Sequence, residues 1–508
     1  MGPPGEGLDR YDALLLAAGT LVLATFVALE ARIAGAPGLP LDDGWIHLRL
    51  ADNLVSGGGF AINPGETVAV STAPLWTVAL AGLLVLGVPG LAATKGLGVA
   101  CWAATGLVTR RLAAAAELPA GLAWGAGLAV LTLGRLVWGA LSGMEVPLAA
   151  LCVAAASWAI ARDRPLLGAA GLGLATLARP EAGLLVVLHA LGGGRWPAAL
   201  RRLTVAAAVL VPSLAFNLVV GGRLVPNTAA AKVEGGLLGQ MEGLTAPWAL
   251  AFRVAGVFLR EWAELLFRDH AALPLLLMVG LVACRPRRLR WLAAALVLHP
   301  IASALVAPYR SPIFQTGRYS SHLLPLAVVV ALAGLERLWR GLPTRRFRVA
   351  VVALLLVALV APVSGEAREY AWAVQNINAM QVTLGQWVAR HTPPDTLIAL
   401  NDLGALSYFG RRRVIDLMGL GTPEILRYRR QGEMAVLGYL GRRCPEYLVV
   451  FPAWFRKLTA REDLFRPIIG VTLSHNVVSG ADTMLVYETV WHRDHRPERQ
   501  ACPAPWAR

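Results

Sequence analysis

The sequence predicts a polytopic α-helical membrane protein with a C-terminal extracytoplasmic α/β domain. Three observations support this fold class: the composition, the position of the arginines, and a change of pattern after residue 364. Hydrophobic residues make up 56% of the 508 residues and charged residues only 16%, and the mean hydropathy is +0.56. A water-soluble globule of this composition would have to expose a very large apolar surface.

Apolar runs follow one another through residues 1–364, which we expect to form the membrane domain. Several are shorter than the roughly 20 residues of a full span, so broken or tilted helices around an internal cavity are expected. About 11 to 13 helical segments are predicted. The runs are Ala13–Ala31, Pro74–Leu86, Leu91–Val108, Leu118–Val137, Pro147–Ile160, Leu166–Leu177, Ala182–Leu191, Leu203–Val220, Leu273–Cys284, Leu289–Ala307, His322–Leu335 and Val349–Val363.

The net charge of +15 comes from arginines that cluster between these runs. Short loops rich in arginine stay in the cytoplasm, whereas a nucleic-acid-binding domain would interleave basic and aromatic residues. We therefore expect a multi-pass protein of the cell membrane that binds no nucleic acid. Its first outer loop would be residues 35–72, and residues 365–508 would also lie outside. The clusters are Arg162 and Arg164; Arg195, Arg201 and Arg202; Arg285, Arg287, Arg288 and Arg290; and Arg337–Arg348.

Residues 365–508 have the pattern of a small α/β domain. A helix-like stretch, Glu366–Arg390, precedes short β-branched or apolar runs, with a second helix-like segment among them. Cys444 and Cys502 are the two cysteines of this exported part, and an oxidising compartment permits them to pair. The segments are TLIALND, RRRVIDLMGL, PEILRYRR, EYLVVFP and DTMLVYETV.

Acidic residues are rare in the membrane domain, and three of them stand at its predicted outer breaks. Asp42 and Asp43 head the first outer loop, and Glu145 occupies a second break. Acids in such places are usually functional, and a carboxylate is a competent general base for an alcohol. One aspartate alone would more often cap the following helix. If Asp42 and Glu145 share a side, one of the three runs between them does not cross, and Pro74–Leu86 is the candidate.

Cations suited to an anionic substrate stand at other outer breaks. Arg179, Lys232 and Arg318 could together hold a phosphate or pyrophosphate group. Taken singly, each has a structural explanation: Arg179 could pair with Glu181, and Arg318 could extend to the membrane interface. Further candidates for substrate binding in the same segments are His47, Glu181, Asn227 and Tyr319.

These segments carry a family resemblance. DDGWIHLRLADNLVSGGGFAINPGETVAVSTAPLWT resembles the first external loop of bacterial GT-C glycosyltransferases, particularly the arabinofuranosyltransferase-like group of actinobacteria. SGMEVPL, ARPE, VPNTAAAK, GRYSSHLLP and NDLGALSYFGRRRVIDLMGL resemble later motifs of that group, in the same order. One departure is Ala229–Ala231, where the family more often has an aromatic residue.

The resemblance implies an inverting glycosyltransferase that moves a sugar, with arabinofuranose as one candidate, from a polyprenyl-phosphate donor to a hydroxyl of a cell-envelope glycan or lipid acceptor. Asp42 would be the catalytic base, Asp43 its support, and Glu145 a positioning residue. Arg179, Lys232 and Arg318 would bind the lipid phosphate. Some GT-C enzymes use a divalent cation, but these acids alone do not define a metal site. The alternatives are a multipass lipid or glycan transporter and a scaffold that recruits partners through the tail.

Overall fold

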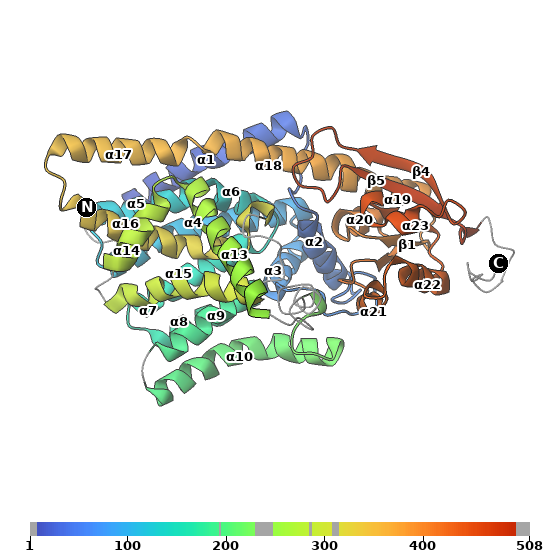
Figure 1. The fold of residues 1–508 in the computed structure, drawn as a ribbon, viewed down its shortest axis with the longest axis horizontal. Coiled ribbons are helices and arrows are strands. Elements are labelled where there is room, and N and C mark those ends of the chain that lie inside the picture. Colours follow the sequence, from blue (N-terminus) through green and yellow to red (C-terminus); the bar gives the residue numbers. More distant parts are fainter. Residues whose placement is uncertain (1–7, 193–194, 229–246, 284–286, 307–313, 494–508) are drawn as a thin grey trace.

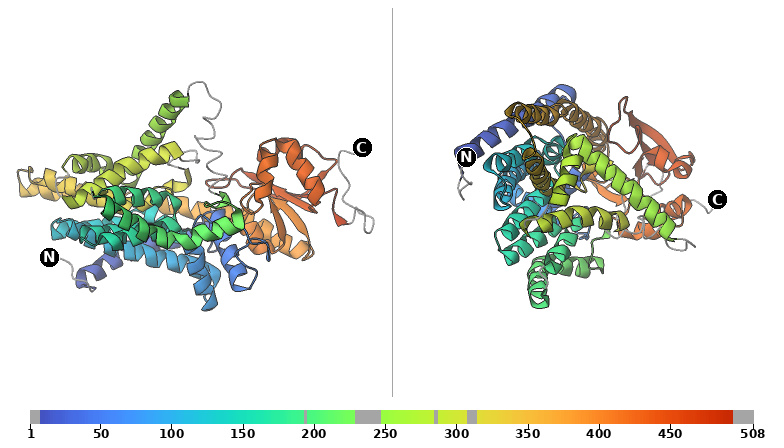
Figure 2. Two further views of the ribbon diagram at one scale, coloured as in Figure 1. Left: turned by 90° about the horizontal axis from the view of Figure 1, so that it is seen from below. Right: turned by 60° about the vertical axis from the view of Figure 1, so that its left-hand side comes forward.

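The computed structural model describes residues 8–192, 195–228, 247–283, 287–306 and 314–493. A bundle of long helices occupies most of the chain, and a domain built on a β-sheet stands at one end of it (Figures 1 and 2). The α/β character predicted for the tail is therefore confirmed.

Capping residues or prolines mark the starts of several bundle helices. In α1 the side chain of Asp9 caps the helix and Asp12 completes a reciprocal capping box. Proline lies in the first turn of α3, α7, α8, α10 and α16, where its missing N–H costs no helical hydrogen bond. The bundle helices are α1 (Arg10–Ile33), α2 (Asp42–Val55), α3 (Pro74–Val85), α4 (Gly90–Ala115), α5 (Ala120–Thr132), α6 (Gly134–Leu141), α7 (Val146–Ala161), α8 (Pro165–Ala178), α9 (Gly183–Leu191), α10 (Trp196–Gly221), α13 (Pro247–Asp269), α14 (Leu273–Ala283), α15 (Arg287–Val306), α16 (Leu324–Trp339), α17 (Arg345–Val360) and α18 (Val363–Ile377).

Within the described residues, five helices are long and apolar enough to cross a membrane. The number rises to seven if each of two bent helix pairs is one span. The bends measure 51° between α5 and α6 and 113° between α13 and α14. The sequence had predicted broken helices. Four further apolar helices are short. The length and apolar composition of these helices are those of an integral membrane protein. The number of 11 to 13 helical segments stays a prediction.

The two ends of the bundle differ. The start of α10 and the link from α16 to α17, both rich in arginine, lie at the end away from the sheet domain (Figure 1). The helices α2 and α3 lie at the other end, beside that domain. The short helix α3 comes from the apolar run Pro74–Leu86, which was the candidate for a run that does not cross.

The C-terminal domain contains a five-stranded sheet of order β2-β1-β3-β5-β4. The strands β2, β1 and β3 are parallel, and β5 pairs antiparallel with both β3 and β4. The strand β4 was not predicted. Most of its residues are exposed at the sheet edge, so buried and exposed residues do not alternate along it. The elements are α19 (Thr383–His391), β1 (Leu397–Leu400), α20 (Gly404–Gly410), β2 (Arg413–Asp416), α21 (Leu426–Arg429), α22 (Glu433–Arg443), β3 (Tyr447–Val450), α23 (Arg456–Thr459), β4 (Phe465–Thr472) and β5 (Thr483–Thr489).

The sheet domain shares a hydrophobic core with the predicted first outer loop. Leu50, Ile62 and Val70 from that loop pack in one buried cluster with residues of the sheet such as Ile398 and Val449. Burying apolar surface between the two parts stabilises their contact. The loop is therefore held between the bundle and the sheet.

The cysteines behave differently in the two parts of the protein. Cys444 takes part in a disulfide bond, whereas Cys101 and Cys152 in the bundle are free thiols. Cys502, which the sequence offered as one partner, lies outside the described residues. The pairing of Cys444 with Cys502 is left open.

Candidate active site

The helix α2 directs two of the predicted residues to one side. Asp43 and His47 are four residues apart, which places them on the same helical face. The N-cap position of α2 is Leu41, and the two aspartates occupy the first turn. Neither aspartate is therefore the N-cap of its own helix, which was the simplest structural explanation for this pair.

Asp42 instead binds the start of another helix, in the C-terminal domain. Its Oδ2 accepts the Gly404 N–H at 2.6 Å and its Oδ1 accepts the Ala405 N–H at 2.7 Å. A carboxylate at a helix N-terminus satisfies amide groups that have no partner within the helix. The approach is close, because a Cβ on Gly404 would lie 1.9 Å from the Asp42 carbonyl oxygen. Asp42 thus joins the first outer loop to α20.

A third carboxylate lies near this junction. Asp402 precedes α20, and its oxygens accept hydrogen bonds from Gln381 Nε2 at 2.8 Å and Asn401 Nδ2 at 3.1 Å. Burial, and then the charge of Asp402, raise the pKa of Asp42 well above its ordinary value, although the two amide hydrogen bonds act in the opposite direction. Burial likewise raises the pKa of Asp402, and Asp43 adds to this effect. Carboxylates whose pKa is perturbed in this way are common at functional sites.

Glu145 stands at the centre of a buried ion-pair cluster. Its Oε1 accepts a hydrogen bond from Arg179 Nη1 at 2.5 Å, and its Oε2 lies 3.3 Å from His47 Nε2. The other ring nitrogen, His47 Nδ1, is 2.9 Å from the Thr77 hydroxyl. All three members of the cluster are buried, so each charge depends on its partners for solvation.

Arg318 extends this cluster to the first outer loop. Its Nη2 lies 2.7 Å from Asp43 Oδ2 and donates to the Tyr319 hydroxyl at 3.2 Å. The guanidinium groups of Arg179 and Arg318 stand 4.9 and 5.0 Å from the centre of the Tyr319 ring, within cation–π range. Asp43, Glu145, Arg179 and the adjacent pair Arg318 and Tyr319 lie far apart in the sequence. The structure brings them together.

Several buried polar atoms of this region have no hydrogen-bond partner. In a folded protein such atoms are rare, and each requires an explanation, such as an absent ligand. They are Glu145 Oε2, Arg179 Nε, Glu181 Oε2, Arg318 Nε and His322 Nδ1. Glu145 Oε2 still faces His47, and Arg179 Nε faces Glu181 Oε2 at 3.5 Å. Arg318 Nε and His322 Nδ1 are therefore the atoms that a polar ligand could satisfy.

The other predicted residues are Glu181, Asn227 and Lys232. Glu181 is 3.5 Å from Arg179 Nε, as the structural explanation for that pair had anticipated. Asn227 bonds through its backbone N–H to the Ala69 carbonyl, at 2.9 Å, so it lies against the first outer loop. Lys232 lies outside the described residues. No group of three or more His, Cys, Asp or Glu side chains in the described part is arranged to hold a metal ion, and we assign no step to one.

Two features of the site escaped the sequence reasoning. Asp402 follows the parallel strand β1, and acids at the carboxyl ends of parallel strands are a recognised signal for sites. His299 and His322 are buried with their Nε2 atoms 3.2 Å apart, and His299 Nε2 lies 3.0 Å from the Glu181 carbonyl oxygen. No local pattern predicted this pair, because the two histidines are 23 residues apart in the sequence.

Comparison with known proteins supports the class of the fold. Residues 373–494 match a family described as a domain of unknown function, DUF8728. No curated protein sequence matches the chain. The chain is similar to the oligosaccharyltransferase of Archaeoglobus fulgidus in complex with zinc and sulfate, with 14% identity, a TM-score of 0.55, and coverage of 92% of this chain and 73% of that one.

Two further solved structures show the same likeness. One is AglB, the Archaeoglobus fulgidus oligosaccharyltransferase, with an inhibitory peptide and a dolichol-phosphate: 13% identity, TM-score 0.55, and coverage of 96% and 75% of the two chains. The other is ArnT from Cupriavidus metallidurans bound to undecaprenyl phosphate: 14% identity, TM-score 0.52, and coverage of 94% and 97%. The protein therefore has the fold of GT-C membrane glycosyltransferases. The narrower arabinofuranosyltransferase-like assignment stays a prediction.

Proposed function

We propose that this protein is an inverting glycosyltransferase that moves a sugar from a polyprenyl-phosphate donor to a hydroxyl group of a cell-envelope acceptor. The observation that carries the proposal is the buried cluster of Glu145, Arg179 and Arg318, which adjoins two aspartates at the end of the bundle beside the sheet domain. Solved structures of the same fold contain dolichol-phosphate and undecaprenyl phosphate. A lipid phosphate is the ligand that suits two buried arginines.

The donor phosphate would lie among the arginines. Arg318 and Arg179 are buried and flank Tyr319, and Lys232 is the third proposed contact. Cations that are fixed before the reaction stabilise the charge that develops on the leaving phosphate. The Nε atom of Arg318, which has no hydrogen-bond partner, provides a donor for the phosphate oxygens.

Asp42 is the proposed base on the acceptor side. The amides of Gly404 and Ala405 fix the orientation of its carboxylate, and each oxygen keeps a further lone pair for an acceptor hydroxyl. Its raised pKa makes it a better proton acceptor near neutral pH than an ordinary aspartate. Asp43, paired with Arg318, links the base to the phosphate side.

The reaction follows from these two roles, that of the arginines at the phosphate and that of Asp42 at the acceptor. As Asp42 takes the proton of the acceptor hydroxyl, the acceptor oxygen forms a bond to the anomeric carbon. The bond between that carbon and the phosphate oxygen breaks, and the arginines hold the polyprenyl phosphate that leaves. A single displacement without a covalent nucleophile inverts the configuration of the anomeric carbon. The family resemblance makes arabinofuranose the first sugar to test.

A panel of radiolabelled polyprenyl-phosphate sugars, incubated with membranes that contain the protein, tests this function. We expect transfer of one sugar to an endogenous acceptor, with polyprenyl phosphate as the second product. The alternative, a lipid or glycan transporter, predicts movement of the intact lipid across the bilayer without transfer of the sugar. A panel without any transfer would reject the proposed enzyme.

The charge of Asp402 should appear in the pH dependence of the reaction. The base must be deprotonated, so kcat/KM should fall as the pH decreases through the pKa of Asp42, at a higher pH than for an ordinary aspartate. Asp402→Asn removes a neighbouring negative charge that raises this pKa, so the acid limb should move to lower pH. Asp463→Asn, which removes an exposed carboxylate paired with Arg461, is the control and should leave the limb in place. An unchanged limb in Asp402→Asn would contradict the assignment.

The orientation in the membrane can be tested by thiol labelling. Single cysteines replace three exposed residues. They are Ser56, which follows α2 in the predicted first outer loop, Glu462 in the sheet domain, and Arg164 in an arginine-rich loop. In a cysteine-free background, we expect an impermeant maleimide to label the first two in intact cells and Arg164→Cys only after permeabilisation. The reverse pattern would place the site in the cytoplasm and remove the proposed donor.

A further inference from the structure

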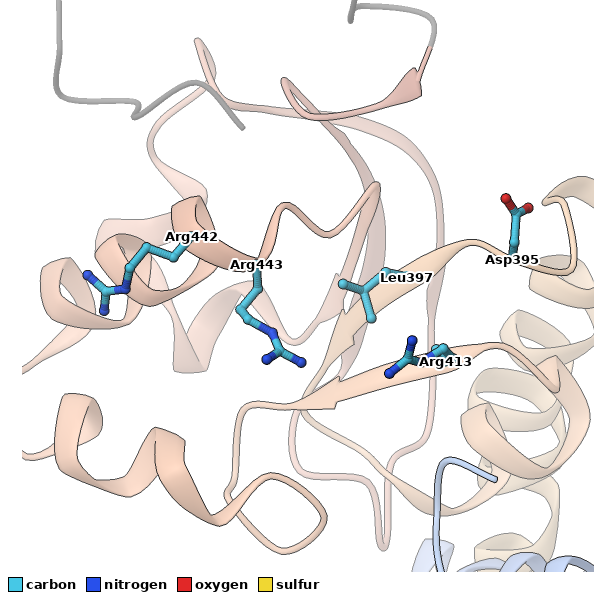
Figure 3. A pocket seen from close by; sticks show the side chains of 5 residues that line it. All are labelled: Asp395, Leu397, Arg413, Arg442 and Arg443. Carbon is cyan, nitrogen blue, oxygen red and sulfur yellow. The ribbon is translucent and has the colours of Figure 1, made fainter. Parts of the chain in front are cut away.

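A basic hollow of about 370 Å³ lies in the C-terminal domain, outside the site described above. It is lined by Asp395, Leu397, Arg413, Arg442 and Arg443. Figure 3 shows the guanidinium groups of Arg413 and Arg443 directed toward each other below Leu397, while Asp395 points away from them. Two like charges that face each other across a hollow repel unless an anion lies between them.

The acid in the lining does not neutralise these arginines. Asp395 Oδ1 lies 3.2 Å from Arg493 Nη2, and the same arginine also binds Glu446. Arg443 is 3.8 Å from Glu424, at the outer limit of an ion pair. Arg413 pairs with Glu66 of the first outer loop. The hollow therefore keeps an excess of positive charge.

On one side of the hollow, Arg442 packs against an aromatic ring. The ring of Tyr428 lies under two guanidinium groups, 4.7 Å from Arg427 and 5.0 Å from Arg442. The Tyr439 ring stands 5.1 Å from that of Tyr428. Tyr439 is buried and its hydroxyl donates to Glu424, and the two guanidinium groups cover the Tyr428 ring. The hollow therefore offers charge to a ligand, since guanidinium groups bind carboxylates and phosphates. A glycan with acidic groups presents the complementary charge.

The hollow also adjoins the loop that carries the proposed base. Asn63 accepts the Val414 N–H at 2.9 Å and donates to the Val414 carbonyl at 3.0 Å, so the loop runs along β2. Glu66 of the same loop reaches Arg413 at the start of that strand. The hollow lies at the amino ends of β1 and β2, whereas Asp42 contacts Gly404 beyond the carboxyl end of β1. A chain bound in the hollow would therefore have to extend along the loop and the sheet to reach Asp42.

We propose that this hollow binds the acceptor, and that the acceptor is an anionic glycan whose carboxylate or phosphate groups lie between Arg413 and Arg443. The inference rests on the proposed function and assigns a substrate class to it. The sheet domain would hold the polymer while its terminal hydroxyl reaches the base. Glu66 would compete with the polymer for Arg413.

Binding of oligogalacturonate, a carboxylate-bearing probe, to the full-length protein in nanodiscs tests the proposal without any transfer reaction. Arg442→Gln/Arg443→Gln should weaken binding about tenfold, because the charge-assisted contact of Arg443 is lost together with the neighbouring positive charge of Arg442. Arg456→Gln/Lys457→Gln removes the same charge from exposed positions on α23 and should change binding little. Glu66→Gln removes the competing carboxylate and should tighten binding. Neutral maltooligosaccharides should not compete.

Three results would overturn the inference. The first is equal binding by wild type and Arg442→Gln/Arg443→Gln, and the second is an equal loss in the α23 control. The third is competition by phosphatidylglycerol vesicles as strong as that by oligogalacturonate, which would assign the hollow to lipid headgroups. Both arginines also lie in the last turn of α22, where cations stabilise a helix, so thermal unfolding is measured in parallel. Failure of the proposed function would appear separately, as absence of sugar transfer by the wild type.

Discussion

Asp42→Asn should reduce sugar transfer by about 10²- to 10⁴-fold, the usual effect of removing a general base. The asparagine has nearly the same shape but cannot accept the proton of the acceptor hydroxyl. Donor binding should persist, because the arginines that hold the phosphate pair with Asp43 and Glu145 instead. Turnover and the binding of a fluorescent polyprenyl phosphate measure the two effects separately. Turnover within about tenfold of wild type would reject Asp42 as the base.

Asp42 also binds the start of α20, so the experiment needs a control for damage to this contact. Asparagine has one acceptor oxygen, so either the Gly404 or the Ala405 N–H loses its partner, at a cost of about 1–3 kcal/mol in unfolding free energy. Gly404→Ala disturbs the same junction by a clash with the Asp42 carbonyl and keeps the carboxylate. We expect Gly404→Ala to lower the Tm while it retains more turnover than Asp42→Asn. Equal inactivation at an equal Tm would show that the junction alone explains the loss.

Arg179→Gln should have two consequences that a second substitution separates. It removes the 2.5 Å partner of the buried Glu145, which then has His47 at 3.3 Å as its ion-pair contact. Breaking a buried ion pair by removing one partner costs about 3–5 kcal/mol in unfolding free energy. It also removes a proposed phosphate contact, worth about 1.5–3 kcal/mol. In Arg179→Gln/Glu145→Gln the carboxylate charge is gone as well, so stability should largely return. Donor affinity should stay at least about tenfold below that of wild type.

A matched pair elsewhere in the bundle gives the control for this result. Lys95 and Glu30 also form a buried ion pair, on α4 and α1, outside the proposed site. Lys95→Gln/Glu30→Gln should alter stability without a change in donor affinity. Thermal unfolding and donor titration are measured for all variants. If Arg179→Gln/Glu145→Gln binds the donor as tightly as wild type, Arg179 has a structural role and the phosphate site lies elsewhere.

Composition and charge position predicted the membrane class and the broad division of the chain. These properties depend on how many apolar residues occur in a row and where arginines interrupt them, and both can be counted along the sequence. The strands β1, β2, β3 and β5 were predicted for a similar reason, because short β-branched runs bounded by polar residues are local patterns. The strand β4 was missed because Pro467 and its exposed neighbours lack such a pattern.

The sequence by itself determined which residues are candidates for the site, since Asp42, Asp43, Glu145, Arg179 and Arg318 are polar residues at breaks in apolar runs. Only the tertiary structure decided which of them meet. It paired Asp43 with Arg318 and Glu145 with both His47 and Arg179, and it brought Asp402 into the site. The contact of Asp42 with Gly404 joins residues 362 positions apart. Helical and strand periodicities extend over a few residues, whereas such contacts form only when distant segments pack against one another.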